Sequence, residues 1–121
     1  LAQLIGKAVI RVAPSLPVMC LAGSTMVSVL QESGLDVMGE AFADRAYEAD
    51  DSLRNRGLDG ALITDPEQAA EQARSIAEYQ KVIAFDGSEI NIEAATICVH
   101  SDTPNALDIA KAVRQTIGII H

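Results

Sequence analysis

The sequence predicts an α/β fold built around a parallel sheet. Short apolar runs typical of buried strands alternate along the chain with segments whose apolar residues recur at helical spacing. The connections are short, and a helix is the crossover that neighbouring parallel strands require. Polar residues directly follow the strands, where the ligand-binding edge of a parallel sheet lies. The 121 residues are enough for one domain or part of one.

The first third of the chain is expected to begin inside a helix. Apolar residues recur at three- and four-residue spacing up to residue 12, and Pro14 and Pro17 then end the helix. No capping residue precedes Leu1, although the first helical turn has four backbone donors to satisfy. We therefore expect earlier residues to be missing. The elements expected here are a helix over 1–12 with an apolar face of Leu1, Leu4, Ile5, Ala8, Val9 and Val12, a strand over 18–22, a helix capped by Ser24 and reaching Gly34, and a strand over 36–42.

The rest of the chain is expected to hold a long polar loop, two helices, a hairpin and a further strand. The loop over 46–60 has no periodic apolar pattern, and loops of this length are often functional. Pro66 suits the first position of a helix that Thr64 or Asp65 caps. The elements expected here are an apolar run over 61–63, a helix from Pro66 with a buried face of Ala69, Ala70, Ala73, Ile76 and Ala77, extended segments over 82–85 and 90–92 around Asp86-Gly87-Ser88, a strand over 96–100, and a helix starting at Thr103-Pro104 with a buried face of Leu107, Ala110, Val113 and Ile117.

The expected strand count is too small for a closed barrel. Three or four parallel strands leave two sheet edges with unpaired backbone groups, and a (β/α) barrel typically needs ~250 residues. We therefore expect residues 1–121 to be the C-terminal part of a single (β/α)-barrel domain whose N-terminal half is absent. That half, or a second copy of the chain, is expected to complete the sheet.

Composition and charge exclude several classes of protein. The net charge is −8 and the nine Lys and Arg residues are scattered, so there is no basic surface for nucleic acid or anionic lipid. No apolar run approaches the ~18 residues of a membrane span. Cys20 and Cys98 lie in separate apolar runs, which favours buried free thiols over a disulfide framework. We expect a soluble, cytoplasmic protein.

His100 is the first candidate for chemistry. A neutral imidazole near pH 7 serves as base, acid or metal ligand. Alternation along the predicted strand puts Cys98, His100 and Asp102 on one side, so Asp102 is expected to orient the ring. Plainer interpretations stay open, in which His100 is structural and Asp102 caps the last helix together with Thr103. Cys98 lies deeper in its apolar run, which disfavours it as a nucleophile.

Glu40, Asp44 and Arg45 form a second candidate group. Two carboxylates beside a guanidinium are suited to an amino-acid-like or phosphorylated ligand. The alternative is a solvated cluster of ion pairs. There is no glycine-rich phosphate-binding motif, and no set of His and Cys residues has metal-ligand spacing, so no metal site is expected.

Three motifs resemble one known family when they are taken together. They are Glu40-Ala41-Phe42-Ala43-Asp44-Arg45-Ala46-Tyr47, Asp86-Gly87-Ser88 and Cys98-Val99-His100-Ser101-Asp102-Thr103-Pro104. In order and spacing they are similar to the LamB/YcsF family, the A subunits of 5-oxoprolinase. The resemblance covers the whole chain but only the C-terminal half of the family's length, and the family's histidine-rich N-terminal motifs have no counterpart here.

The resemblance implies a seven-stranded relative of the TIM barrel, akin to glycoside hydrolases and deacetylases. It implies ATP-dependent hydrolysis of the lactam of 5-oxo-L-proline to L-glutamate, with B and C subunits as partners and ATP, together with magnesium, as co-substrate. The chain alone is expected to be inactive. The resemblance assigns catalysis to His100, Asp102 and Glu40, and ligand binding to Asp44, Arg45, Tyr47, Thr103 and Asp86.

Two other functions stay open. One is a metal-dependent, deacetylase-like hydrolase. The other is a non-catalytic binding or assembly module that uses its open sheet edges to pair with another polypeptide.

Overall fold

Strands and helices alternate along the chain, as predicted. The structure is a computed structural model and describes residues 1–118. The elements are α1 (Ala2–Val12), β1 (Val18–Leu21), α2 (Thr25–Glu32), β2 (Val37–Phe42), α3 (Pro66–Tyr79), β3 (Lys81–Ile83), β4 (Glu89–Asn91), β5 (Thr96–Cys98) and α4 (Ala106–Ile117).

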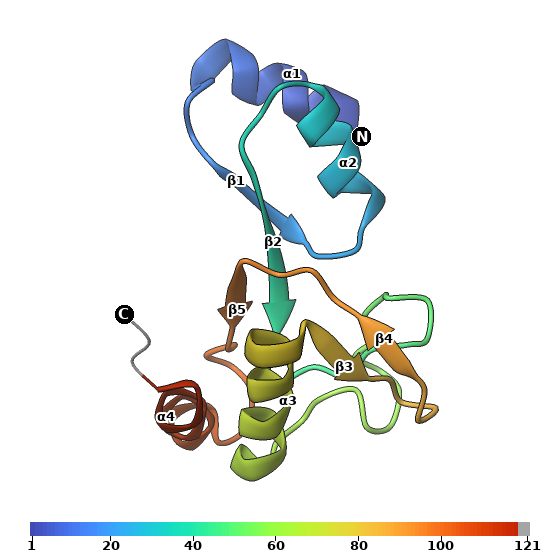
Figure 1. The fold of residues 1–121 in the computed structure, drawn as a ribbon, viewed down its shortest axis with the longest axis vertical. Helices are drawn as coiled ribbons and strands as arrows, with labels where there is room; N and C mark the ends of the chain where they lie inside the picture. Colours follow the sequence, from blue (N-terminus) through green and yellow to red (C-terminus); the bar gives the residue numbers. More distant parts are fainter. Residues whose placement is uncertain (119–121) are drawn as a thin grey trace.

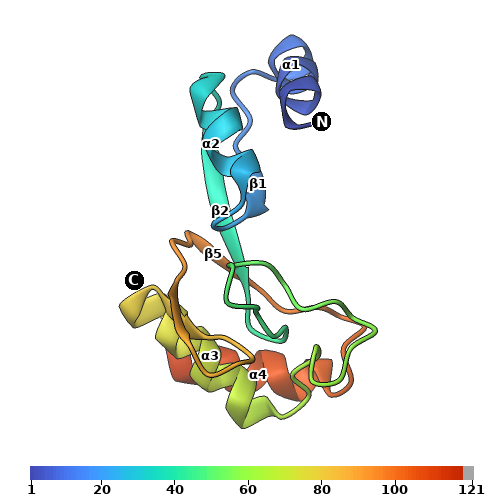
Figure 2. The same ribbon diagram turned by 90° about the vertical axis from the view of Figure 1, so that its right-hand side faces the viewer.

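A parallel sheet of three strands in the order β1-β2-β5 organises the molecule. Strand β1 pairs with residues 37–40 of β2, whereas β5 pairs with residues 40–42, so the two neighbours of β2 are staggered along it. Figures 1 and 2 show the consequence: β1, α1 and α2 lie at one end of β2, and α3, α4 and the β3–β4 hairpin lie at the other. The C-terminal end of β2 is therefore surrounded by segments from residues 43 to 118.

Helices cover only one face of this sheet. On the covered face, Cys20 and Ala41 are buried, and Ile97 packs into the clusters formed with α3 and α4. The residues between these along each strand point to the opposite face. On that face Met19 is 59% exposed and Phe42 is only partly buried. Parallel sheets are normally covered on both faces. No helix among residues 1–118 covers the second face of this sheet.

The α/β class and the parallel sheet are thus confirmed, but the described strands do not close a barrel. A strand count of seven stays a prediction. None of the described helices has the length and apolar character needed to cross a bilayer.

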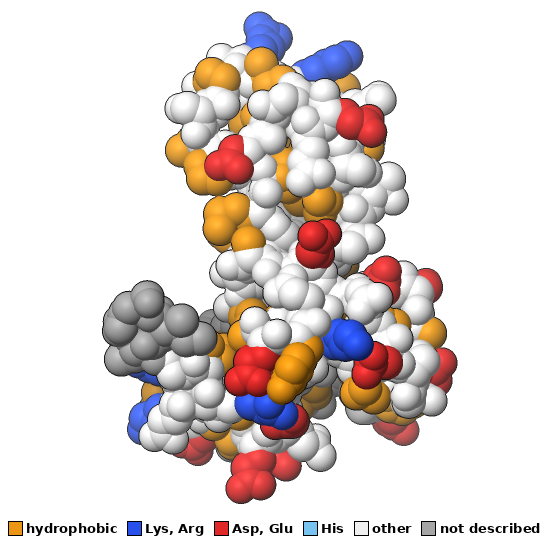
Figure 3. Space-filling model, viewed as in Figure 1, with side chains coloured by type: hydrophobic (Ala, Val, Ile, Leu, Met, Phe, Trp, Pro, Cys, Tyr) orange, Lys and Arg blue, Asp and Glu red, His pale blue; other side chains and the backbone are white. Residues whose placement is uncertain are grey.

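Helix α1 forms where the spacing predicts it, and Leu1 makes no side-chain cap. Its predicted apolar face is divided. Ile5 and Val9 are half-buried, and Val9 packs against the cluster that contains Leu30 of α2, whereas Leu4 and Val12 are 68% and 84% exposed. Figure 3 shows apolar side chains on the surface of this end of the molecule. Four of the six residues of the predicted face are therefore exposed within the described structure.

The predicted buried face of α4 is partly wrong. Leu107 is 68% exposed and Ala110 is exposed, while Ile109 and Val113 are buried. The helix begins at Ala106, after Asn105 in the left-handed conformation (φ 64°), rather than at Thr103-Pro104. It packs along α3, and this contact selects the stripe that contains Ile109 and Val113.

Helix α3 matches its prediction closely. Asp65 caps it by accepting a hydrogen bond from the Glu67 amide at 3.0 Å, and Pro66 occupies the first turn. Four of the five predicted face residues are buried. Ala77 is exposed instead, because it lies in a surface hollow beside residues 94–97 and Ile117. Ser24 precedes α2, as predicted, but its hydroxyl makes no capping hydrogen bond.

The loop over 46–60 is irregular, as predicted, but it is tightly held. Its two limbs are joined by hydrogen bonds from the Glu48 amide to the Ser52 carbonyl and from the Arg54 amide to the Ala46 carbonyl. The Arg54 guanidinium pairs with Glu48 at 2.8 Å and lies 3.7 Å from the centre of the Phe85 ring. The predicted β3–β4 hairpin is confirmed, so Arg54 ties the loop to the hairpin.

Gly39 offers a direct test of the packing on the covered face of β2. A Cβ atom at this position would lie 2.6 Å from the Glu93 carbonyl oxygen, which belongs to the backbone and cannot swing away. Gly39→Ala is expected to lower the free energy of unfolding by about 1–3 kcal/mol, the usual cost of overpacking. Chemical denaturation of the purified protein measures this. Gly57→Ala, on an exposed loop with space for a Cβ, is the control, and equal stability of the two variants would contradict the packing.

Candidate functional site

Asp44 is the centre of the candidate site. It lies two residues beyond the end of β2, and its side chain is completely buried. One carboxylate oxygen accepts hydrogen bonds from the His100 amide and from the Thr103 hydroxyl, both at 2.8 Å. The other lies 3.0 Å from Nδ1 of His100. One carboxylate thus joins the segments that follow β2 and β5.

These contacts fix the charge of Asp44. Burial by itself raises the pKa of this carboxyl, but the hydrogen bonds from His100 and Thr103 outweigh burial and hold the pKa below its ordinary value. Asp44 is therefore ionised at neutral pH and only accepts hydrogen bonds. Nδ1 of His100 must carry the proton that the two groups share. In the neutral ring, the lone pair is then on Nε2.

The His100 ring is held in place but is not sealed off. It stacks on Phe42, with ring centres 5.0 Å apart and planes 18° apart. Its side chain is 24% exposed. Within residues 1–118, Nε2 has no hydrogen-bond partner among the protein groups. A carboxylate-oriented, partly exposed imidazole whose Nε2 has no partner among these residues is the arrangement of a general base.

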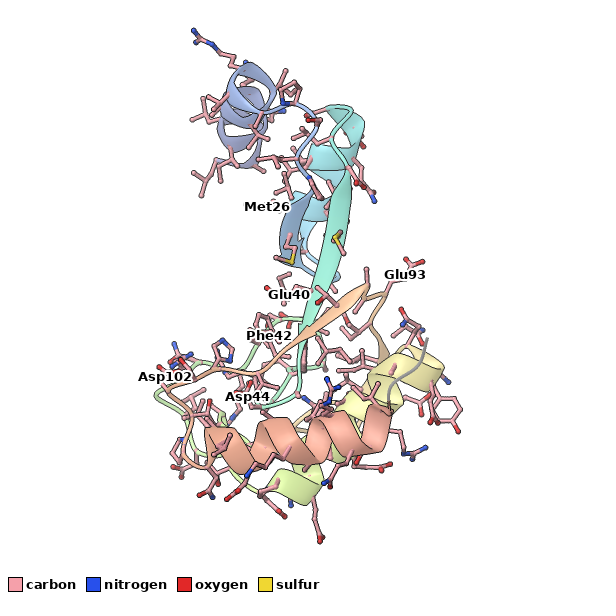
Figure 4. All side chains as sticks on the ribbon, turned by 90° about the vertical axis from the view of Figure 1, so that its left-hand side faces the viewer. Met26, Glu40, Phe42, Asp44, Glu93 and Asp102 are labelled. Atoms are coloured by element: carbon pink, nitrogen blue, oxygen red, sulfur yellow. The ribbon has the colours of Figure 1, made fainter. Side chains whose placement is uncertain are left out.

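The structure corrects the expected partner of His100. The ring is oriented by Asp44, not by Asp102, because β5 ends at Cys98 and alternation does not extend to residue 102. The strand ends there because the His100 amide bonds the Asp44 carboxylate instead of a neighbouring strand. Asp102 is exposed and lies 3.5 Å from Arg56. Figure 4 shows Asp44 at the end of β2 and Asp102 at the far end of the connection after β5.

Asp102 and Thr103 do not cap α4 either, since Asn105 is the residue that precedes the helix. Thr103 is buried and donates to Asp44. A catalytic role for Asp102 stays a prediction. Thr103 belongs to the frame of the site, not to its accessible surface.

Arg45 follows Asp44 but does not pair with it. The Arg45 side chain is buried, and its only hydrogen bond within the described residues runs from Nη2 to the Arg54 carbonyl at 2.9 Å. The Nε atom is buried without a partner. Burial, and next the charge of Arg56, lower the pKa of the Arg45 guanidinium. The predicted group of Asp44, Arg45 and Glu40 is therefore not a cluster of ion pairs.

Tyr47 supports the backbone of the site. It is fully buried, and its hydroxyl accepts a hydrogen bond from the Phe42 amide at 3.0 Å, at the last residue of β2. Burial raises the pKa of Tyr47 to about 12, so the phenol stays neutral. This position suits a structural role better than the predicted contact with a ligand.

Glu40 and Cys98 lie on the open face of the sheet. Glu40 is half-buried, and its carboxylate has no hydrogen-bond or ion-pair partner among residues 1–118. It precedes Phe42 and Asp44 by two and four residues on the same side of β2, as Figure 4 shows. Burial, together with the carboxylates of Glu40 and Asp44, raises the pKa of Cys98, which keeps the thiol protonated and disfavours it as a nucleophile.

Asp86 is not brought into this cluster. Its carboxylate accepts hydrogen bonds from the amide and hydroxyl of Ser88 within the turn between β3 and β4. Both residues are exposed. The motif Asp86-Gly87-Ser88 shapes the hairpin turn, with Gly87 at φ 91°.

Gln72 is a site residue that sequence reasoning missed. From α3, its Nε2 donates to the carbonyls of Phe42 and Arg45, both at 2.8 Å, on either side of Asp44. The available signal was a long polar side chain beside the small apolar face Ala69, Ala70 and Ala73. In the described part of the chain, no group of three or more His, Cys, Asp and Glu side chains is arranged to hold a metal ion.

Known proteins resemble this chain over nearly its whole length. The sequence model of the LamB/YcsF family matches residues 1–119. A curated relative from Heliobacterium modesticaldum, named as the A subunit of 5-oxoprolinase, is 46% identical over 98% of this chain and 48% of its own length. A relative of the same name from Coprothermobacter proteolyticus is 41% identical over 100% of this chain and 46% of its own length.

A solved structure is similar as well. The crystal structure of the lactam utilization protein from Thermus thermophilus matches with a TM-score of 0.86 at 40% identity, over 96% of this chain and 46% of that one. The chain thus spans about half the length of the relatives it matches. Sequence and fold agree that the chain belongs to the LamB/YcsF family.

Proposed function

We propose that this chain provides part of the active site of a 5-oxoprolinase, within the A component that takes part in hydrolysing the lactam of 5-oxo-L-proline to L-glutamate. Relatives at 41–46% identity are named as A subunits of 5-oxoprolinase. The observation that carries the proposal is the Asp44–His100 pair, in which Asp44 orients a partly exposed imidazole. The ATP requirement and the B and C partner subunits are part of the proposal and rest on the family relationship.

His100 would act on the water that opens the lactam. An unstrained five-membered amide resists attack, and phosphorylation of its oxygen by ATP would make the carbonyl carbon electrophilic. Nε2 then removes a proton from the attacking water as the new C–O bond forms. The same proton is returned to the lactam nitrogen as the C–N bond breaks, which leaves an open-chain acyl phosphate. A second water molecule would then hydrolyse the acyl phosphate, releasing inorganic phosphate and L-glutamate. Asp44 keeps the imidazole in the required tautomer and stabilises its protonated form.

The active site of this proposal includes groups from outside the chain. His100, Phe42 and Glu40 face the open side of the sheet, where the described residues supply no opposite wall. The unpaired sheet edges and the exposed apolar face of α1 also need cover. We propose that the remaining length of a longer protein, or a second copy of the chain, completes this wall. Residues 1–121 alone are then inactive.

Glutamate release tests the proposed function directly. The full-length protein that contains this chain, combined with the B and C subunits, is expected to release L-glutamate from 5-oxo-L-proline only when ATP is present. His100→Ala is expected to slow this by roughly 100- to 10,000-fold, the usual contribution of a general base. Asp108→Asn, at an exposed position in the first turn of α4, is the control and should behave as wild type. Full activity of His100→Ala would remove His100 from the mechanism.

The depressed pKa of Asp44 predicts how its contribution to stability depends on pH. Because this pKa is lower in the folded state, the ionised carboxylate stabilises the fold above the unfolded value of about 4 and ceases to do so as pH falls through the folded value. Asp44→Asn should therefore be less stable than wild type at neutral pH. Denaturation at a series of pH values should show the difference shrinking in acid. A difference that grows in acid would contradict this sign.

Gln72 is proposed as a positioning residue for Asp44. In Gln72→Glu a carboxylate would face the carbonyls of Phe42 and Arg45, which repel it, so the backbone around Asp44 should shift. We expect kcat to fall by ~10-fold or more with KM changed far less, since misplacement of an oriented base is costly. Gln68→Glu, which adds the same charge at an exposed position of α3, is the control. If the two variants have the same kcat, Gln72 does not position the site.

A further inference from the structure

Arg45 is a buried cation whose hydrogen-bonding capacity is largely unused. The residue is 8% exposed, and of its five N–H groups only one, on Nη2, has a partner within the described residues. Nε is buried and unpaired. Nη1 also makes no hydrogen bond there, but unlike Nε it is not completely buried.

This arrangement is costly without a counter-ion. A buried charge normally has a partner of opposite sign, and a buried donor left unpaired costs free energy. No carboxylate among residues 1–118 lies within ion-pairing distance of Arg45, although Asp44 is its neighbour in the sequence. The three hydrogen bonds of Asp44 are directed to His100 and Thr103 instead.

A second guanidinium lies close to the first. Arg45 bonds the carbonyl of Arg54, and Arg56 follows two residues later in the same loop. After burial, the charge of Arg56 is the next cause that lowers the pKa of Arg45, and the opposing effects of Asp44 and Tyr47 do not offset the two. Arg56 also lies 3.5 Å from Asp102, in a pair whose side chains are 49% and 69% exposed. Exposed pairs of this kind are weak, so Arg56 is free to exchange Asp102 for another anion.

We propose that Arg45 and Arg56 together bind the anionic group of a ligand, a carboxylate or a phosphoryl group, next to the segment that carries His100 and Asp102. Two guanidiniums whose charges would otherwise repel each other are both stabilised by one shared anion. Guanidinium donors also match the planar geometry of carboxylate and phosphate oxygens. Asp102 holds Arg56 in the absence of ligand and releases it when the anion binds.

This anion site deepens the proposed function and rests on it only for the identity of the ligand. In lactam hydrolysis the anion is either the carboxylate of 5-oxo-L-proline or a phosphate of ATP. The carboxylate lies on the ring carbon next to the lactam nitrogen, so holding it would fix the lactam carbonyl relative to His100. Binding measurements with separate probes distinguish the two sources.

Arg56→Ala is the informative variant, because its half-exposed side chain leaves the fold intact when removed. In the full-length protein, titration calorimetry with 5-oxo-L-proline, pyrrolidin-2-one, ATP and inorganic phosphate compares this variant with wild type. Pyrrolidin-2-one is the same lactam without the carboxylate. Arg45→Lys, which keeps the charge but loses the planar donor array, is the second variant. Arg114→Ala, at an exposed position near the end of α4, is the matched control.

We expect Arg56→Ala and Arg45→Lys to weaken binding of one anion by roughly 10-fold or more, the effect of losing one charge-assisted hydrogen bond. Binding of pyrrolidin-2-one and the Arg114→Ala control should be unchanged. A loss confined to 5-oxo-L-proline identifies the carboxylate, and a loss confined to ATP and phosphate identifies the phosphoryl group. The proposal is overturned if both anions bind the two variants as they bind wild type, if wild type binds neither, or if pyrrolidin-2-one is weakened equally.

Failure of this proposal and failure of the proposed function give different results. If phosphate binding depends on Arg56 but no glutamate is formed from 5-oxo-L-proline, the anion site stands and the function is wrong. If glutamate is formed at the wild-type rate by Arg56→Ala with unchanged affinity for every probe, the function stands and the anion site is wrong.

Discussion

The Asp44 carboxylate is the constraint on which the candidate site depends. It is a buried charge, and such a charge persists only if its oxygens are fully hydrogen-bonded. Its partners are the amide and ring of His100 and the hydroxyl of Thr103, all from the segment after β5. Satisfying this one charge therefore ends β5, aligns the imidazole and fixes the path into α4.

The backbone around Asp44 is held from two further directions. Gln72 bonds the carbonyls of Phe42 and Arg45 from α3, and the Tyr47 hydroxyl accepts the Phe42 amide. Both side chains thus bond backbone amide and carbonyl groups at the end of β2 that would otherwise need a neighbouring strand as their partner. The end of β2 is thus rigid, while the face beside it, which carries Glu40 and His100, is open. A rigid half-site that faces an uncovered surface is consistent with a chain about half as long as its relatives.

The spacing of apolar residues predicted most of the helices and strands, because each element must place apolar side chains on the face that it buries. Periodicity was less informative where a single tertiary contact determines which residues are buried. The buried face of α4 is set by its packing on α3 and by its start after Asn105, so the exposure of Leu107 does not follow from the spacing. The sequence also singled out His100 but paired it with Asp102, whereas the structure brings it to Asp44. The pairing with Asp102 required the strand to continue to residue 102. The partner in the structure is Asp44, which lies 56 residues away in the sequence, and no local pattern predicts a contact at that separation.

The protonation of His100 tests the central claim most directly. Nitrogen-15 NMR of the full-length protein at neutral pH distinguishes the two neutral tautomers of a histidine ring. If Asp44 orients the ring, the neutral form of His100 carries its proton on Nδ1 and leaves Nε2 unprotonated, and the Asp44→Asn substitution changes this pattern. A neutral His100 ring protonated on Nε2 in the wild-type protein would contradict the account, because the lone pair would then point at the carboxylate and not toward a substrate.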